Sequence, residues 1–210
     1  MIVHQSNDAR DPLESASDNG QQTYQSSSGQ RRVILVAGVS TSGKTYSLEG
    51  LRKREPGRLI LSASSILGEL GRPLRPLTPD QAIANQMALM SELHRRGASL
   101  IKGLLLDGHA MIETTEGSMP VPDWWYDDLA LEGLVHIEAD AGEIAARRSA
   151  RSLPWTEVEA RTEQEAERNA IRRQAARLGI PSLEIPGDDL DGFAHWLRAV
   201  SRSNGAASDR

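Results

Sequence analysis

Short apolar runs alternate along this chain of 210 residues with longer stretches of helical periodicity. This alternation is typical of repeated strand–helix–strand units, which place parallel strands in one central sheet. The runs are apolar at nearly every position, and this indicates strands that are covered on both faces. The predicted strands are residues 33–37, 59–61, 104–106, 134–137 and 182–185. The pattern therefore predicts an α/β fold with three layers, in which helices cover both faces of a five-stranded parallel sheet.

Two long stretches between these strands have a clear helical pattern. In residues 79–96 the apolar side chains recur at helical spacing, and we interpret them as a stripe that faces the core. Residues 156–178 are rich in Arg and Glu and carry a stripe of alanines. This composition favours one long helix, or two, with a largely solvated face.

The two ends of the chain have a different character from its middle. Residues 4–30 are nearly all Ser, Gln, Asn, Asp, Gly and Thr, and such a segment cannot bury enough surface to offset the entropy of ordering it. Residues 201–210 are similarly polar. We therefore expect a disordered polar leader at 1–30, one folded domain at 31–200 and a flexible tail at 201–210.

Composition narrows the classes of function. The net charge is −5, so the chain lacks the basic surface that general nucleic-acid and membrane binders need. No apolar run approaches the roughly 20 residues that cross a bilayer, and the first residues lack the pattern of a signal peptide. The absence of cysteine excludes disulfides, thiolate zinc sites and a cysteine nucleophile. We expect a cytoplasmic protein that binds neither nucleic acid nor membranes.

The first predicted strand leads directly into a phosphate-binding motif. Residues 38–45 fit the pattern G-x-x-x-x-G-K-[ST], and a helical pattern follows them. Glycines let such a loop turn its backbone N–H groups around a phosphate, and the helix that follows adds its positive dipole end. The candidate ATP-binding residues are Gly38, Val39, Ser40, Thr41, Ser42, Gly43, Lys44 and Thr45.

Four of the candidate residues have predicted roles at the reacting phosphates or beside them. The Lys44 ammonium is expected on the β- and γ-phosphates of ATP, and the Thr45 hydroxyl is expected to be a ligand of Mg²⁺. Asp107 directly follows the third strand, where it can hold Mg²⁺ or orient the phosphoryl acceptor. His109 is a candidate for contact with the acceptor. The alternatives are a turn-forming role for Asp107 and a packing role for His109.

Arginines at two places are further candidates. Arg147 and Arg151 follow the fourth strand, and arginines that close over a transferring phosphoryl group stabilise its charge. The alternative is a solvated basic turn of helix. Arg72 and Arg75 lie in a proline-containing loop and are candidates for binding a phosphate of the acceptor; the alternative is a plain surface turn.

Several stretches together resemble the P-loop nucleoside monophosphate kinases, in particular the archaeal-type adenylate kinases. Besides the P-loop, residues 105–112 are similar to that family's strand ending in Asp-Thr-His-Ala-Val-Ile, and residues 117–122 are similar to its Gly-Tyr-Leu-Pro-Gly-Leu-Pro turn. Residues 135–140 and the pair Arg147–Arg148 resemble the family's strand, Ala-Asp-Pro turn and lid arginines. The resemblance covers residues 33–197.

This resemblance implies a sheet with strand order 2-3-1-4-5, ATP on residues 38–45 and a small lid at 147–155. It also implies an acceptor region at 64–86, in which Arg72, Arg75 and Gln86 correspond to positions near the monophosphate. The chain departs from the family in this region, because Ser62-Ala63-Ser64-Ser65 replaces a Gly-Asp pair and the spacing between Arg72 and Arg75 is shorter. These departures leave the identity of the acceptor open.

Three hypotheses about function follow. The leading one is a Mg²⁺- and ATP-dependent kinase that phosphorylates a small acceptor, with a nucleoside monophosphate as the expected acceptor and Lys44, Asp107, Arg147 and Arg151 as catalytic residues. The second is a kinase for another small-molecule hydroxyl acceptor, with Asp107 or His109 near the attacking oxygen. The third is an ATP-dependent switch or accessory ATPase that uses the polar leader to bind a partner. The aromatic residues 124–126 are interpreted as packing, with stacking on an acceptor base as the alternative.

Overall fold

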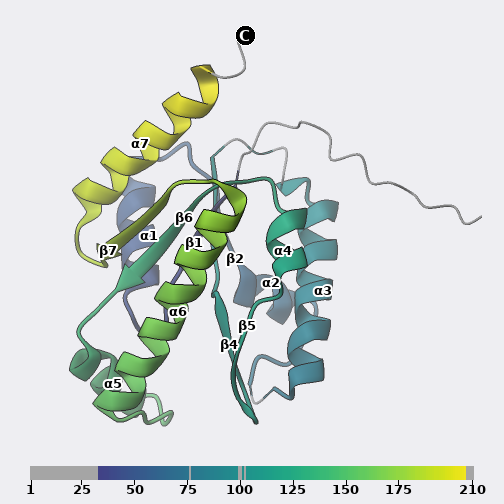
Figure 1. Cartoon of the computed structure of the whole chain (residues 1–210), viewed down its shortest axis with the longest axis vertical. Helices are drawn as coiled ribbons and strands as arrows, with labels where there is room; N and C mark the ends of the chain where they lie inside the picture. Colours follow the sequence, from purple (N-terminus) through teal and green to yellow (C-terminus); the bar gives the residue numbers. More distant parts are fainter. Residues whose placement is uncertain (1–32, 76, 99–100, 102, 207–210) are drawn as a thin grey trace, which may run out of the picture.

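The computed structural model describes residues 33–75, 77–98, 101 and 103–206 (Figure 1). The polar leader expected at 1–30 lies outside the described residues, as does the end of the tail at 207–210. Among the described residues no helix is both long enough and apolar enough to span a membrane.

A parallel sheet lies at the centre of the molecule, and its strand order is β2-β3-β1-β6-β7. Each strand expected from the apolar runs is present. Strands β4 and β5 form a separate sheet, so β6 and β7 are the fourth and fifth strands of the parallel sheet. The order is then 2-3-1-4-5, and the expected fold class is confirmed. The strands are β1 (Val33–Ala37), β2 (Ile60–Ser62), β3 (Leu104–Asp107), β6 (Leu131–Glu138) and β7 (Ser182–Pro186).

Helices cover both faces of this sheet. Alternate side chains of β1 point to opposite faces and so enter two separate cores. Val33 and Leu35 belong to a core that includes side chains of α2 (Ala63–Glu69), α3 (Pro79–Arg95), α4 (Asp123–Asp128) and α6 (Glu157–Leu178). Ile34 and Val36 pack on the opposite face against α1 (Lys44–Arg54) and α7 (Leu190–Ala206). The short helix α5 (Ala141–Ser149) packs on α6 at the lower end in Figure 1. The expectation of three layers is thus confirmed.

Local signals explain where the helices α3 and α6 begin. Thr78 caps α3 and Thr156 caps α6, and in both helices a side chain three residues later closes a capping box. Helix α6 ends at Gly179, whose φ of 61° places it in the left-handed region that glycine favours. The stretch 156–178 is therefore one helix. Helix α7 continues to Ala206, so most of the tail expected at 201–210 continues this helix.

A small antiparallel hairpin was not predicted. It consists of β4 (Met111–Thr114) and β5 (Gly117–Pro120), and it follows β3 directly. Its strands are short and partly exposed, so they lack the apolar run that identified the others. In Figure 1 the hairpin extends downward between α6 and α3, and this position brings it to one wall of the functional site described below.

Candidate functional site

The phosphate-binding loop connects β1 to α1, and its glycines are required by its surroundings. A Cβ on Gly38 would lie 2.6 Å from the carbonyl oxygen of Ile137 in β6, so only glycine fits at this crossing. Gly43 has a φ of 102°, a conformation that other residues rarely adopt. Helix α1 begins at the next residue, Lys44, so its free N–H groups and positive dipole end face the loop.

Lys44 lies inside this loop and is almost fully buried. Its Nζ donates hydrogen bonds to the carbonyl oxygens of Gly38 and Val39. Burial lowers the pKa of the ammonium, while the negative charges of Asp107 and Glu167 oppose this shift. The ammonium is therefore held at the position where the loop can receive a phosphate group.

Asp107, the last residue of β3, lies opposite the loop. It pairs in register with Val36 of β1, which places its carboxyl at the carboxyl edge of the sheet. Burial raises its pKa, and the nearby charges of Lys44 and His109 oppose the shift. Asp107 and the exposed Thr45 line the same cavity. A hydroxyl and a carboxylate suit Mg²⁺, which keeps several waters and takes further ligands from substrate phosphates, so these residues fit the ion expected from the sequence.

This first cavity has a volume of about 1060 Å³ and follows the carboxyl edge of the sheet. Loop residues 40–45 line it, together with Asp107, Glu138, Arg147, Arg151 and the segment 186–188 after β7. Ligands of parallel α/β proteins bind at this edge of the sheet. The cavity is long enough to combine a phosphate site at the loop with room for the rest of a nucleotide.

A second cavity of about 540 Å³ adjoins the first. Its walls come from α2, the loop before α3, α3 itself, the hairpin and α6. Ser40, Ala63, Ser64, Gly108 and His109 line both cavities. The two cavities therefore meet at the end of β3, beside Asp107 and the phosphate-binding loop.

The predicted arginines and acceptor residues divide between the two cavities. Arg147 and Arg151 line the first cavity, and Arg147 donates a hydrogen bond to the carbonyl oxygen of Thr41 at 3.2 Å. Arg75 and Gln86 line the second cavity. Arg72 lines neither of these cavities, because its Nε binds the side-chain oxygen of Asn85 at 2.9 Å.

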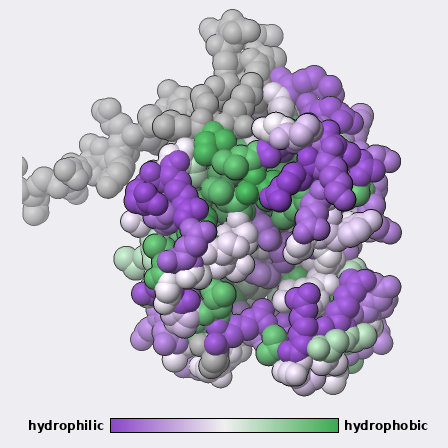
Figure 2. All heavy atoms as spheres, turned by 180° about the vertical axis from the view of Figure 1, so that it is seen from behind, coloured by the Kyte–Doolittle hydropathy of each residue, from purple (hydrophilic) through white to green (hydrophobic). Residues whose placement is uncertain are grey.

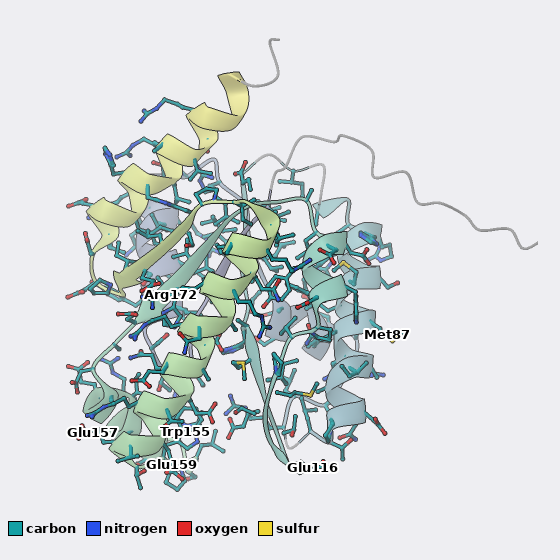
Figure 3. All side chains as sticks on the ribbon, viewed as in Figure 1. Met87, Glu116, Trp155, Glu157, Glu159 and Arg172 are labelled. Carbon is teal, nitrogen blue, oxygen red and sulfur yellow. The ribbon has the colours of Figure 1, made fainter. Side chains whose placement is uncertain are left out.

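Arg148 belongs to the pair that resembles lid arginines, but the sequence did not indicate that it points inward, to the second cavity. It lines the second cavity and is only 2% exposed. Its Nη2 donates to both carboxylate oxygens of Glu113 at 3.0 and 3.2 Å, and its guanidinium lies 3.4 Å from the centre of the Trp155 ring. Figure 3 shows Trp155 and the hairpin turn at Glu116 at the same end of the molecule.

Glu113, in strand β4 of the hairpin, is another residue of the second cavity that was not predicted from the sequence. Its carboxylate also lies 3.7 Å from Arg75, so it stands between two arginines of the second cavity. The apolar part of the wall includes Trp125, which is 2% exposed and packs edge to face on Tyr126 with ring centres 5.4 Å apart. Trp125 and Tyr126 therefore pack in the core as interpreted, whereas Trp124 is exposed. Trp125 also faces the cavity.

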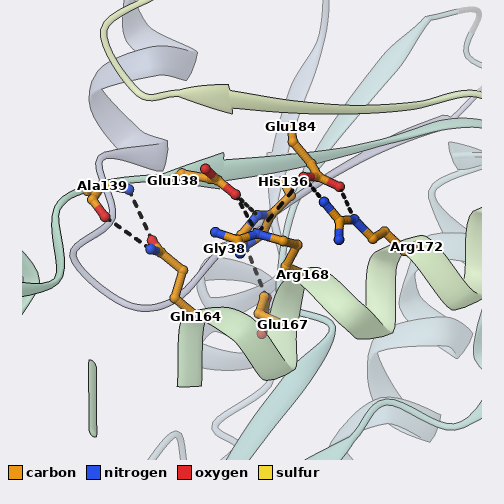
Figure 4. Close-up of polar contacts among 9 residues, drawn as sticks. All are labelled: Gly38, His136, Glu138, Ala139, Gln164, Glu167, Arg168, Arg172 and Glu184. Atoms are coloured by element: carbon orange, nitrogen blue, oxygen red, sulfur yellow. Dashed lines mark hydrogen bonds and ion pairs between the residues drawn. The ribbon is translucent and has the colours of Figure 1, made fainter. Parts of the chain in front are cut away.

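Helix α6 contributes two buried polar side chains that hold the loops of the site (Figure 4). The Gln164 amide binds both the N–H and the carbonyl oxygen of Ala139, each at 3.0 Å. The Glu167 carboxylate accepts hydrogen bonds from backbone N–H groups, one of which is that of Gly38 at 3.0 Å. Neither residue is evident from the sequence, because the Arg- and Glu-rich composition of this helix predicts a largely solvated face. Their spacing of three, on one face with the buried Ala160 and Ile171, was the available signal.

Comparisons with known proteins agree with this geometry. Residues 37–170 match the family model AAA_17, which describes an AAA domain. The chain is 29% identical over 162 residues to an adenylate kinase of Methanothermobacter thermautotrophicus, a match that covers 72% of this chain and 85% of the relative. These matches confirm the resemblance inferred from the sequence motifs.

The chain is also similar to two solved structures. One is a gluconokinase from Sinorhizobium meliloti, with a TM-score of 0.47, 16% identity and coverage of 83% of this chain and 93% of that one. The other is a sugar kinase from Janibacter sp., with a TM-score of 0.49, 16% identity and coverage of 82% and 97%.

Proposed function

The chain belongs to the AAA_17 family of AAA domains, and we propose that it is a P-loop small-molecule kinase that transfers the γ-phosphoryl group of ATP to a nucleoside monophosphate. One observation carries this proposal. Two cavities meet beside Lys44 and Asp107, and both are lined by Gly108 and His109. A donor in the first cavity and an acceptor in the second would bring their phosphates together at this junction.

The first cavity supports ATP as the donor. Its loop presents backbone N–H groups and the Lys44 ammonium to the β- and γ-phosphates. Thr45 and Asp107 are the residues that would hold Mg²⁺. When it is bound, this ion neutralises part of the negative charge of the phosphates. Residues 38–45 form a complete P-loop motif between β1 and α1, and we therefore assign ATP to the first cavity.

The transfer itself requires positioning and charge stabilisation from the chain. The bond between the γ-phosphorus and the β,γ-bridging oxygen breaks, and a bond forms between that phosphorus and an acceptor oxygen. Lys44 stabilises the negative charge that remains on ADP, and Arg147 and Arg151 approach the transferring group from the α5 side of the cavity.

The second cavity supports an acceptor with an anionic group and a flat apolar part. Arg75 and Arg148 face it, and the Nη1 atom of Arg148 has no hydrogen-bond partner among the described residues. Leu67, Leu89 and Trp125 supply apolar wall for a base. The identity to an adenylate kinase favours a nucleoside monophosphate as the molecule with these parts.

The charges of the second cavity favour a second candidate, a kinase of a hydroxyl acceptor. Glu113 already pairs with both Arg75 and Arg148, and an uncharged acceptor would leave these pairs intact. A hydroxyl must lose its proton as it attacks, and Asp107, whose pKa is raised by burial, lies at the junction where it can take that proton.

Product analysis separates these candidates. The full chain is incubated with Mg²⁺-ATP and each nucleoside monophosphate in turn, and the products are resolved by chromatography, with Lys44→Ala as the control. The proposal predicts ADP together with the diphosphate of at least one added nucleotide, and neither product with Lys44→Ala. ADP formed only with added polyols or sugars would establish the second candidate. ADP formed without any acceptor would identify an ATPase and overturn both.

A further inference from the structure

A single buried carboxylate joins the two halves of the site. Glu167, in the middle of α6, is 1% exposed. Its Oε1 accepts hydrogen bonds from the N–H of Gly38 at 3.0 Å and from the N–H of Ala110 at 2.8 Å. Its Oε2 accepts one from the N–H of Met111 at 2.9 Å. One oxygen atom thus bridges two backbone segments that lie far apart in the sequence.

These two segments contribute to the walls of both cavities, the loop mainly to the first and the start of the hairpin to the second. Gly38 is the first residue of the phosphate-binding loop, and its carbonyl oxygen accepts a hydrogen bond from Lys44. Ala110 and Met111 connect the end of β3 to the hairpin, which carries Glu113 in the wall of the second cavity. A movement of the loop at Gly38 therefore acts on Glu167, and through it on the start of the hairpin. Figure 4 shows the contact between Gly38 and Glu167.

The charge of Glu167 suits this bridging role. Burial raises the pKa of its carboxyl, but His109 and Lys44, with the backbone N–H of Ala110, outweigh burial, and the pKa lies below its usual value. The His109 imidazole also lies near this carboxylate, with its Nδ1 3.6 Å from Oε1. An ionised carboxylate has acceptors only, so all the N–H groups that meet it are satisfied at once.

We propose that Glu167 is a positioning residue that couples nucleotide binding at the phosphate-binding loop to the placement of His109 and the hairpin in the acceptor cavity. The proposal concerns the site to which the proposed function assigns transfer, and its kinetic consequence rests on that function. The coupling itself requires only that a nucleotide binds the loop.

Replacement by glutamine changes this bridge in a defined way. The amide of Glu167→Gln keeps one acceptor oxygen and replaces the other with an NH₂ donor. If the oxygen stays at Gly38 and Ala110, the NH₂ faces the N–H of Met111, and two donors then oppose each other. If the amide turns over, Gly38 and Ala110 lose their acceptor. The matched control is Glu165→Gln, which makes the same change on the same helix at an exposed position.

Methyl NMR with the β,γ-imido analogue of ATP tests the coupling without any acceptor. The methionine methyl groups are ¹³C-labelled, because Met111 and Met119 both lie in the hairpin and neither lines the first cavity. Addition of the analogue with Mg²⁺ is expected to shift both hairpin methyl resonances in the wild type and in Glu165→Gln. In Glu167→Gln these shifts should be lost, while the exposed Met87 on α3 serves as the internal reference.

Two outcomes would overturn the coupling. Hairpin resonances that do not respond in the wild type, although the analogue binds, show that no signal crosses from the loop. Equal responses in Glu167→Gln and Glu165→Gln show that Glu167 is only a structural residue. If Glu167→Gln does not fold, Glu167→Asp keeps the charge on a shorter side chain and should reduce the shifts, and the wild-type measurement can still overturn the proposal.

Kinetics distinguish failure of this inference from failure of the proposed function. With an active acceptor, Glu167→Gln should lower kcat by at least about tenfold, because misplacement of reacting groups is costly. The kcat of Glu167→Gln and of the control Glu165→Gln is measured at saturating ATP, so that a change in nucleotide affinity does not enter the comparison. An unchanged kcat in Glu167→Gln would count against positioning. An absence of turnover with every monophosphate in the wild type would remove the proposed function and leave the methyl measurement as the test of the coupling.

Discussion

Two adjacent arginines show how strongly the environment of a residue decides its role. Consecutive side chains on a helix point about 100° apart, so Arg147 and Arg148 of α5 face different surroundings. Arg147 is half exposed and contacts the phosphate-binding loop, whereas Arg148 is buried between Glu113 and Trp155. The sequence identified the pair as candidate lid arginines, but it could not identify the inward one, because Glu113 comes from a hairpin that the apolar pattern did not reveal.

The burial of Arg148 leads to a prediction about stability. Glu113→Gln removes the carboxylate that accepts from its Nη2, and this should lower the free energy of unfolding by about 1–3 kcal/mol. The control is Glu143→Gln, which removes the carboxylate paired with the more exposed Arg147 and should change stability by less than about 0.5 kcal/mol. Urea unfolding gives the free energy of unfolding of each variant relative to the wild type. Equal losses would show that the Arg148 pair behaves as an ordinary surface contact.

Asp107 gives a second prediction, which links the stability of the folded protein to pH. Its raised pKa means that the folded state bears a cost when the carboxylate is ionised, at pH values above that pKa. Below the pKa of the unfolded chain the carboxyl is protonated in both states, and the cost is absent. Asp107→Asn should therefore be more stable than the wild type at pH 7 and should lose turnover, and its extra stability should shrink as the pH falls.

Thermal unfolding across this pH range tests the prediction, with the exposed Asp128→Asn as the control. The control should show no such pH-dependent difference from the wild type. A variant Asp107→Asn that is less stable than the wild type at pH 7 would mean that the buried carboxylate is compensated by its surroundings.

At the scale of elements, helix α6 is the largest difference between expectation and structure. Its bounds could be predicted, because Thr156 and Gly179 are strong start and stop signals. Its role could not, because Gln164 and Glu167 become buried only where the loops after β6, β1 and β3 meet. Figure 2 shows the opposite side of the molecule, where hydrophilic side chains predominate and hydrophobic ones form separate areas.

The cap of α6 provides a prediction at this scale. Thr156→Ala removes the side-chain acceptor of the Glu159 N–H and opens the capping box, at an expected cost of about 1 kcal/mol. Thr162→Ala, at an exposed position within the same helix, should cost nothing, because alanine is the better helix former. Urea unfolding of both variants gives the comparison. A loss no larger in Thr156→Ala than in Thr162→Ala would show that packing alone holds the start of α6.

At the scale of the whole molecule, the fold could be predicted more fully than the site. Strands buried on both faces give continuous apolar runs, and the P-loop is a local motif, so both are visible in the sequence. The strand order came from the resemblance to a family, not from the apolar pattern. The second cavity brings together Arg75, Glu113 and Arg148 from three separate segments, and no local pattern indicates that they meet.

If the two cavities hold a donor and an acceptor, the phosphoryl group passes directly from one to the other. A single-turnover reaction follows this transfer, with enzyme in excess over ATP labelled with ³²P at the γ-phosphate, Mg²⁺ and a mixture of nucleoside monophosphates. We predict that the wild type moves the label into a nucleoside diphosphate and that Lys44→Ala leaves it in ATP. Label released by the wild type as inorganic phosphate alone would contradict direct transfer, because the phosphoryl group would then have passed to water and not to a bound acceptor.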